Sequence, residues 1–361
     1  MIQLFHSFSW LFIIVTFLPL VNHPHWFFRV FDFGKIQLFI FQALLLVLSV
    51  CFIAFSGTLL LTQISLAISI CYIATILYIY TPLYKVKNAQ FSDKSSKPIT
   101  IISTNVYQFN KEYQRFVDFI KKNQPDIFIT MESNQAWDDA MKVLEADYPY
   151  FHKIPLENTY GLHFYSKLKA EKITPYFFVA DDIPSIEADL VSEDNFRFTV
   201  FALHPPPPSP TEEETSRERD GELLSIAKKI RNSPKQTFIA VGDFNTVAWG
   251  RSSRLFRKTS EMIDPRMGRG FISTFHAKYR LLRFPIDQIF HTPNVFVDEL
   301  KALKNVGSDH LPIYCRFVIN HFDDSQEELV KTLEEGVMKK VNEIIQDGIE
   351  EQSDREKVVT E

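Results

Sequence analysis

Three long runs of apolar residues occupy the first 80 positions of the chain. They extend over residues 2–21, 36–56 and 58–80, and the second and third contain no charged residue. Each run approaches the ~20 residues that a helix needs to cross the hydrocarbon core of a bilayer. The first run contains His6 and lacks both the basic start and the small-residue cleavage site of a signal peptide. We therefore predict three transmembrane helices that form an anchor over residues 1–82.

After a lysine-containing linker over residues 83–98, the pattern changes to short runs rich in Ile, Val, Phe and Thr. Such runs predict strands, here over residues 99–103, 127–131, 196–203, 237–241, 286–290 and 311–319. Apolar residues at helical spacing predict helices over residues 113–120 and 212–230, the first of which ends before Pro125. Strands that alternate with helices indicate a soluble α/β domain over residues 99–320.

The tail, residues 321–361, has a third pattern. Apolar residues recur at every fourth position from Leu329 to Ile349, which predicts an amphipathic helix. From residue 323 onward the tail contains 13 acidic and 5 basic residues, a net charge of −8 (5 minus 13). Anionic lipid would repel such a helix, so we expect it to pack on the domain or to self-associate.

Polar residues that can carry chemistry gather at the ends of the predicted strands. Carboxylate and amide oxygens hold hard divalent cations, and imidazole transfers protons, so together they suit a metal site that splits phosphate esters. Asp287 differs from the others because it lies within a predicted strand, where its carboxylate needs a buried partner such as an imidazole. The eight candidates are Asn105, Glu132, His204, Asp243, Asn245, Asp287, Asp309 and His310.

Each candidate also has a simpler interpretation as a turn, a helix cap or a loop residue. These simpler interpretations would all have to hold independently, which makes the joint catalytic interpretation the better one. The three cysteines, Cys51, Cys71 and Cys315, have no spacing typical of a disulfide framework or a zinc site.

The ordered motifs resemble those of the endonuclease/exonuclease/phosphatase superfamily over residues 99–320. The resemblance implies a four-layer α/β sandwich, with two packed mixed sheets flanked by helices, and a phosphohydrolase that depends on Mg²⁺ or Mn²⁺. The three preceding spans resemble a bacterial membrane-anchored branch of the superfamily. Met131 departs from the family, where Gln often precedes the metal-binding Glu. The motifs are Asn105, Pro125-Asp126, Glu132, His204-Pro205, Gly242-Asp243-Phe244-Asn245, Pro285-Ile286-Asp287 and Gly307-Ser308-Asp309-His310-Leu311-Pro312.

The resemblance implies that Glu132 binds the metal ion, with Asn105 and Asp309 as its partners.

The remaining residues would act on the substrate. Asp243 would orient or deprotonate the attacking water, and Asn245 would hold a phosphate oxygen. His310, paired with Asp287, would act as acid and base, and His204 would donate to the phosphate or the leaving group. Family members differ over which group takes the proton of the water, so the roles of Asp243 and His310 are interchangeable at this stage.

The substrate is less strongly indicated than the reaction. Residues 251–283 contain nine basic and two acidic residues, a net charge of +7, whereas residues 91–320 contain 30 of each sign. A duplex nuclease needs a broad basic surface, which a neutral domain on a membrane supplies poorly. We therefore expect an anionic substrate that is lipid-linked or resembles a lipid headgroup. The alternatives are a metal-dependent nuclease held at the membrane and a scaffold protein without turnover.

The side of the membrane is open to two interpretations. With three spans, Arg29, Lys35, Lys85 and Lys87 lie on one side, and the positive-inside rule then places the domain in the cytoplasm. The membrane-anchored proteins that the chain resembles suggest an extracytoplasmic domain instead. Four charges are a small bias, so we favour the extracytoplasmic placement.

Overall fold

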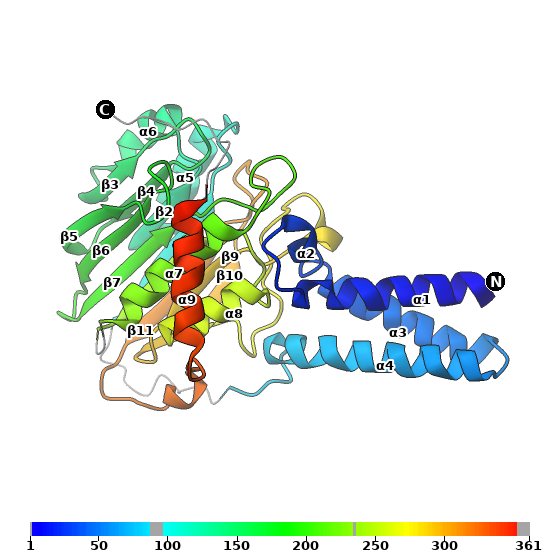
Figure 1. Ribbon diagram of the computed structural model, residues 1–361. Coiled ribbons are helices and arrows are strands. Elements are labelled where there is room, and N and C mark those ends of the chain that lie inside the picture. The colour runs from blue at the N-terminus through cyan, green and yellow to red at the C-terminus, as the bar shows by residue number, and fades with distance from the viewer. Residues whose placement is uncertain (1, 87–96, 234–235, 352–361) are drawn as a thin grey trace.

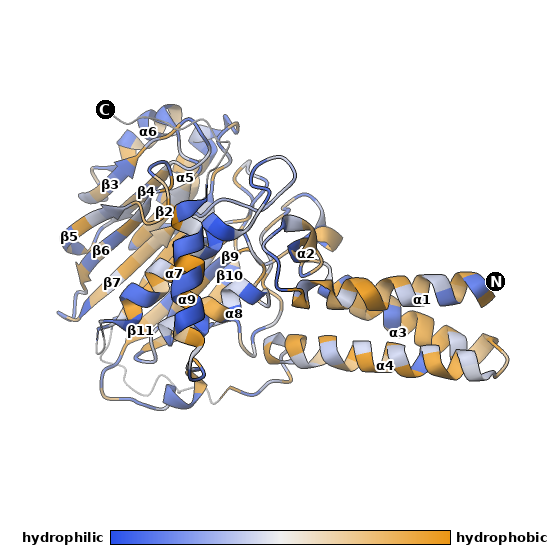
Figure 2. Ribbon diagram, viewed as in Figure 1, coloured by the Kyte–Doolittle hydropathy of each residue, from blue (hydrophilic) through white to orange (hydrophobic). Residues whose placement is uncertain are grey.

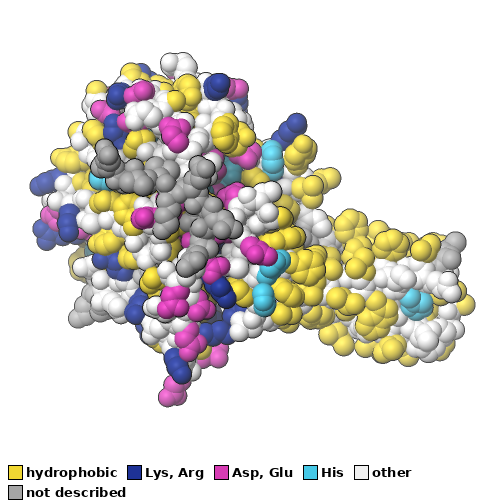
Figure 3. All heavy atoms as spheres, turned by 45° about the horizontal axis from the view of Figure 1, so that its top comes forward, with side chains coloured by type: hydrophobic (Ala, Val, Ile, Leu, Met, Phe, Trp, Pro, Cys, Tyr) yellow, Lys and Arg dark blue, Asp and Glu magenta, His cyan; other side chains and the backbone are white. Residues whose placement is uncertain are grey.

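A bundle of three apolar helices projects from one side of an α/β sandwich (Figure 1). The computed structural model describes residues 2–86, 97–233 and 236–351. The three helices are long and apolar enough to cross a membrane, and on the face seen in Figure 3 they show no charged side chain. They are α1 (Ile2–Phe17, continued by η1, Leu18–Leu20), α3 (Lys35–Phe52) and α4 (Gly57–Leu77, continued by η2, Tyr78–Tyr80). The short helix α2 (Trp26–Val30) lies at the junction with the sandwich.

Eleven strands of the described chain form two mixed sheets. The first sheet has the order β10-β11-β1-β2-β4-β3, and the second has the order β5-β6-β7-β8-β9. In the first sheet the strands are β1 (Ile99–Asn105), β2 (Ile127–Met131), β3 (Tyr150–Ile154), β4 (Leu162–Ser166), β10 (Val295–Ala302) and β11 (Ile313–Ile319). In the second they are β5 (Lys169–Tyr176), β6 (Ser185–Val191), β7 (Arg197–Leu203), β8 (Phe238–Asp243) and β9 (Asp287–His291).

Helices cover the outer face of each sheet, which makes four layers. Helices α5 (Tyr113–Asn123) and α6 (Gln135–Met141, followed by η3, Lys142–Leu144) pack on the first sheet through a core that includes Phe116, Phe128 and Trp137. Helices α7 (Arg217–Arg231) and α8 (Arg251–Ser260) pack on the second sheet. A larger apolar core joins the facing sides of the two sheets. The predicted fold class is confirmed.

Every predicted strand is present, but five strands were not predicted. The unpredicted strands β3 and β5 lie at sheet edges, where half-exposed residues replace the continuous apolar run of a buried strand. The helix predicted over residues 212–230 begins only at Arg217, because the chain after the proline run first forms an irregular loop.

The predicted tail helix is shorter than its sequence pattern. Residues 321–336 contain only a short turn, η5 (Glu327–Leu329), and helix α9 (Val337–Glu350) begins after Gly336, whose φ is 79°. Helix α9 packs on α7, and a Cβ atom at Gly348 would lie 3.0 Å from Gly221 Cα. Contacts with the domain therefore bury Val341 and Gly348 of α9, while its outward face is mostly hydrophilic (Figure 2) and Ile349 stays 48% exposed. Residues 87–96, which form most of the linker predicted over residues 83–98, lie outside the described residues, as do residues 352–361 of the tail.

The anchor and the sandwich share one apolar core. Leu38, Leu77 and Tyr80 of the anchor pack with Trp249 and Ile286 of the sandwich. The Trp249 indole donates to the Asp32 carbonyl at 2.7 Å, and the Tyr80 hydroxyl donates to the Ala248 carbonyl at 2.9 Å.

Two of the four charges behind the topology argument are used in this junction. Arg29 is buried and donates to the Pro19 carbonyl at 3.2 Å, and Lys35 is buried in an ion pair with Asp32. Packing explains both residues, so they carry little information about the side of the membrane.

Glu222 fastens α7 to the second sheet. Its side chain is fully buried, and the Ser185 hydroxyl of β6 donates to its Oε1 at 2.6 Å. Burial raises the pKa of this carboxyl to about 8 from its usual value near 4.5. The folded chain therefore holds this proton more tightly than the unfolded chain does.

We predict that Glu222 makes the stability of the protein fall between pH 4.5 and 8. In this window the unfolded chain releases the Glu222 proton while the folded chain keeps it, so the free energy of unfolding decreases as the pH rises. Glu222→Gln removes this titration and should raise the apparent Tm more at pH 8 than at pH 5. Thermal unfolding of the full chain in detergent measures both, with the exposed Glu335→Gln as the control. An equal change in Tm at the two pH values would contradict the assignment.

Candidate active site

The candidate residues converge at one edge of the sandwich because adjacent strands end there. Parallel pairing of β1 and β2 places Asn105 opposite Met131, so Glu132 follows directly beside it. In the second sheet, antiparallel pairing of β8 and β9 places Asp243 opposite Asp287. The two sheets thus contribute from both sides, and strand ends position their side chains more rigidly than free loops would.

Unusual backbone conformations turn several of these side chains into the site. Glu132 and Asn245 have φ values of 58° and 49°, a region that residues other than glycine seldom adopt. Such conformations persist where the surrounding structure enforces them, and they concentrate at functional sites. Gly242, just before Asp243, has no room for a side chain, since a Cβ atom would lie 1.9 Å from the Leu203 carbonyl oxygen.

His310 is the centre of a buried charge cluster. Its Nδ1 lies 2.8 Å from Asp287 Oδ2, and its Nε2 lies 3.5 Å from Asp243 Oδ2. Burial by itself lowers the pKa of His310, but the two carboxylates outweigh it and raise this pKa to about 10. Burial raises the pKa of Asp243, and the His310 charge opposes that rise. The arrangement therefore stabilises an imidazolium between two carboxylates.

Glu132 occupies the other side of the site. The Asn105 amide donates to Glu132 Oε1 at 2.7 Å and more weakly to Asp243 Oδ2 at 3.4 Å, while the backbone N–H of Gln108 donates to Glu132 Oε2 at 3.1 Å. Burial raises the pKa of Glu132, and the carboxylate of Asp309 raises it further. The amide nitrogen of Asn105, rather than its oxygen, thus faces the carboxylates, and its role as a metal ligand stays a prediction.

His204 and Asn245 complete the set. His204 Nε2 lies 3.9 Å from Asp243 Oδ2, and burial lowers the pKa of His204 to about 3, so its ring is neutral. The Asn245 amide donates to the Pro205 carbonyl at 2.9 Å, and its backbone N–H donates to Asp243 Oδ1 at 2.9 Å. All eight predicted residues therefore belong to one region of the molecule.

The structure adds positioning residues that the sequence did not reveal. Buried Arg219 of α7 donates to the Asn245 carbonyl at 3.0 Å, and Arg266 donates to the Asp287 carbonyl. Ser308 donates to the Asn105 carbonyl at 2.8 Å and accepts from the His310 backbone at 3.0 Å. Ser308 had a signal because it belongs to the motif that contains Asp309 and His310, and Arg266 had a weaker one because it belongs to the basic segment of residues 251–283. Arg219 lies far from any motif in sequence.

A divalent cation fits the chemistry of this site. Asp243 and Asp287 each present a carboxylate oxygen, and these oxygens lie within 4.8 Å of each other and of a His310 ring nitrogen, whose proton keeps His310 itself from being a ligand. Asp287 Oδ1 is buried and has no hydrogen-bond donor among the described residues. Carboxylate oxygens such as those of Glu132 and Asp309 are the donors that Mg²⁺ and Mn²⁺ prefer.

The comparisons with known proteins agree with this geometry. The model of the Endonuclease/Exonuclease/phosphatase family matches residues 102–310. No curated protein matches the chain.

Several solved structures share the fold at low sequence identity. TDP2 of D. rerio, in complex with a single-strand DNA product, is 19% identical with a TM-score of 0.52, covering 61% of this chain and 99% of its own. An endonuclease/exonuclease/phosphatase family protein from Bacteroides thetaiotaomicron is 18% identical with a TM-score of 0.52, covering 62% and 99%. The catalytic domain of human Nocturnin with bound sulfate is 18% identical with a TM-score of 0.51, covering 62% and 94%.

We predict that Asp287→Asn leaves the fold intact but lowers turnover about 10³-fold. The amide neither stabilises the imidazolium nor holds the His310 ring in the required tautomer. The pKa of His310 should fall from about 10 toward its ordinary value, which histidine-selective NMR measures beside the hydrolysis rate. The exposed Asp147→Asn is the matched control. Near-normal turnover in a folded Asp287→Asn chain would show that this pair does not serve catalysis.

Proposed function

The chain belongs to the endonuclease/exonuclease/phosphatase family, whose members are metal-dependent hydrolases of phosphate esters, and we propose that it hydrolyses a phosphate ester carried by a membrane lipid. The observation that carries this proposal is the apolar core that joins the anchor to the catalytic edge. Ile286 precedes Asp287, Trp249 follows Asn245 by four residues, and both pack on anchor helices. The loops beside Asp243 and Asp287 are therefore packed against the anchor, which supports a substrate carried at the bilayer surface.

A loop of residues 275–284, which we call the interface loop, supports the same substrate class. At one end the Phe275 ring lies 4.8 Å from the His310 ring, and the Ala277 N–H donates to the Asp309 carbonyl at 2.6 Å. At the other end Gln37, in the first turn of α3, donates to the Leu281 carbonyl at 2.8 Å. At this end of the loop, Leu281 is 87% exposed and Leu282 is 55% exposed. Exposed leucines beside a membrane helix favour insertion into the bilayer.

An apolar groove offers a place for the hydrocarbon part of such a substrate. The groove has a volume of about 540 Å³ and lies between α3 and α4, where Phe39 and Leu77 are among its lining residues. Phe271, just before the interface loop, closes one side of it. The Phe271 ring lies 5.9 Å from the ring of Trp249, so the groove lies beside the loop that follows Asn245.

Different residues of the site would then perform the separate steps of the hydrolysis. Glu132 and Asp309 would hold the metal ion, which when bound neutralises charge that develops on the phosphoryl oxygens. Asp243, 3.5 Å from His310 and 3.9 Å from His204, is placed to orient a water and to accept its proton.

The remaining groups act on the leaving side. The His310 imidazolium, held by Asp287, can donate its proton to the leaving oxygen. Neutral His204 can donate only a hydrogen bond, and the second N–H of the Asn245 amide is available for a phosphoryl oxygen.

We predict that the full chain in nanodiscs hydrolyses phosphate esters only with Mg²⁺ or Mn²⁺, and lipid phosphates faster than nucleotides or DNA. The full chain is needed because removal of the anchor would expose Trp249 and Ile286 beside the site. One assay across lipid phosphates, nucleotides and DNA, with and without EDTA, measures both points. Activity undiminished by EDTA would exclude the metal, and DNA cleavage faster than turnover of every lipid phosphate would replace this substrate by nucleic acid.

We predict that Leu281→Gln/Leu282→Gln lowers kcat/KM about tenfold for a substrate in a vesicle, because two apolar side chains no longer enter the bilayer. The rate on a short-chain, water-soluble phosphate ester should stay unchanged. Phe322→Gln is the matched control, since Phe322 is 93% exposed and lies in the segment after β11. An equal loss on both substrates would mean that the interface loop acts only on the fold of the site.

A further inference from the structure

A second pocket lies at the junction, away from the catalytic residues. We call it the basic pocket. It has a volume of about 350 Å³, and the anchor contributes Pro19, Leu20 and Tyr72 to its wall. Helices α8 and α9 contribute three cations, Arg251, Arg254 and Lys340. Two helices that are far apart in the sequence thus bring positive charge to one cavity at the edge of the apolar anchor.

These three cations have no partner within the part of the chain that the structure describes. Neither the guanidinium groups of Arg251 and Arg254 nor the Lys340 ammonium forms a hydrogen bond or ion pair with a residue in the ranges 2–86, 97–233 and 236–351. The acid in the wall of the pocket is Asp32, and Lys35 already neutralises it in a buried ion pair. The basic pocket therefore has an unbalanced positive charge, which an anion would satisfy.

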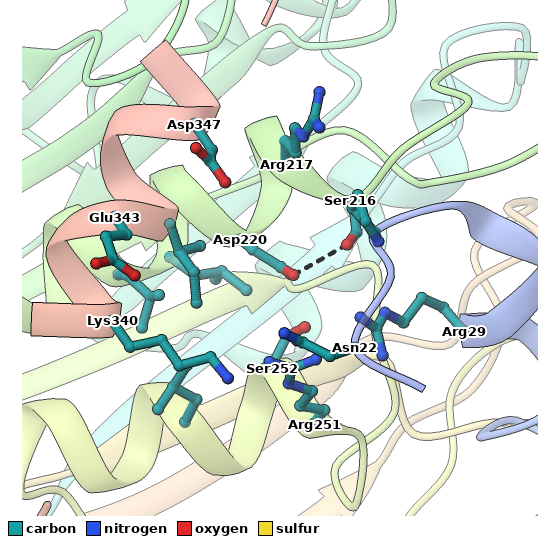
Figure 4. Close-up of a pocket in the computed structure, with 15 residues that line it drawn as sticks. Asn22, Arg29, Ser216, Arg217, Asp220, Arg251, Ser252, Lys340, Glu343 and Asp347 are labelled. Atoms are coloured by element: carbon teal, nitrogen blue, oxygen red, sulfur yellow. Dashed lines mark hydrogen bonds between the residues drawn. The ribbon is translucent and has the colours of Figure 1, made fainter. Parts of the chain in front are cut away.

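An adjoining cavity of about 190 Å³ shows a related imbalance (Figure 4). It shares Arg251 and Lys340 with the basic pocket, and the side chains of Lys340 and Arg29 extend into it from opposite sides. Arg29 is only 7% exposed, its Nε has no hydrogen-bond acceptor among the described residues, and burial lowers its pKa.

The acids of this adjoining cavity decide where an anion would bind. Its wall contains three acids, Asp220, Glu343 and Asp347, whereas the wall of the basic pocket contains one, Asp32. Asp220 is itself paired with Arg219. An anion is therefore attracted to the basic pocket, where fewer acids oppose it, rather than to the adjoining cavity.

The position of the basic pocket relative to the anchor indicates the source of the anion. Pro19 and Leu20 end the first candidate span, and Leu20 is 57% exposed. Tyr72 belongs to the third span, and tyrosine is typical of the headgroup level of a bilayer. A molecule in this pocket would have its charged end between α8 and α9 and its apolar end beside the spans.

We propose that the basic pocket binds the phosphate-bearing headgroup of an anionic phospholipid, at a site separate from the substrate site. The proposal rests on insertion of the anchor in a bilayer but not on the identity of the substrate. The bound phosphate joins Arg251 and Arg254 of α8 to Lys340 of α9 beside the anchor. The lipid thereby fastens the tail helix and the outer helix layer to the membrane end of the molecule.

The test is lipid binding by the full chain in a non-ionic detergent, measured by native mass spectrometry with dioleoyl phosphatidylglycerol and dioleoyl phosphatidylcholine. The chain should retain phosphatidylglycerol in preference. The variant Arg251→Gln/Arg254→Gln/Lys340→Gln should weaken its retention about a hundredfold, since each cation near an anionic lipid contributes about fivefold. The matched control is Lys121→Gln/Lys122→Gln/Lys172→Gln, which removes three exposed charges of the sandwich and should bind as the unaltered chain does.

Further arms separate the alternatives. Equal retention of the two lipids, or an equal effect of the two triple variants, would overturn the proposal. Glycerol 3-phosphate that competes as well as the lipid would assign the pocket to a soluble phosphate instead. If the triple variant does not fold, Lys340→Gln alone, on the exposed face of α9, should still weaken retention about fivefold. Because binding is measured without turnover, a wrong substrate assignment would leave this result unchanged.

Discussion

The contact between the anchor and the loops on either side of the second-sheet carboxylates is the constraint on which the rest of the structure depends. Trp249 and Ile286 are buried by anchor residues, yet each lies within six residues of Asp243 or Asp287. Burying a side chain such as Ile286 stabilises a fold by about 1.5–3 kcal/mol, so the loops cannot move freely from the anchor. The anchor is therefore part of the active-site support as well as a candidate membrane attachment.

The second constraint is electrostatic. Asp243, Asp287 and His310 are nearly completely buried, and isolated charges at such depth would be strongly unfavourable. They are tolerated because the imidazolium lies between the two carboxylates and because the backbone of Asn245 donates to Asp243. Burial makes the charged forms of this cluster less favourable, and it also shifts the pKa values of Asp243 and His310 away from those in water. The surrounding sheets also hold Glu132 and Asn245 in backbone conformations with positive φ, which direct their side chains into the site.

The two ends of the molecule show different limits of sequence interpretation. The motif residues were found because their types and their positions at strand ends are local properties, visible in a few consecutive letters. The contacts of Arg219 and Arg266 were missed because each side chain donates to a backbone carbonyl of a distant segment. Arg251 and Arg254 were interpreted only as part of a basic segment. In the structure the cations of that segment have different roles. Some of its cations support backbone carbonyls, as Arg269 does, whereas Arg251 and Arg254 line a pocket of the anchor junction.

The sequence by itself indicated the three long apolar helices, six of the strands and the candidate site residues, because these follow from apolar run length, from local propensity and from side-chain type. Only the tertiary structure decided the shape of the tail. The pattern of an apolar residue at every fourth position already includes Leu329 and Leu333. The helix nevertheless starts only at Val337, where it can pack on α7. It also decided that the catalytic edge lies against the anchor. That placement depends on which loops bury Leu38, Leu77 and Tyr80, and contacts between distant segments leave no periodic signal in the chain.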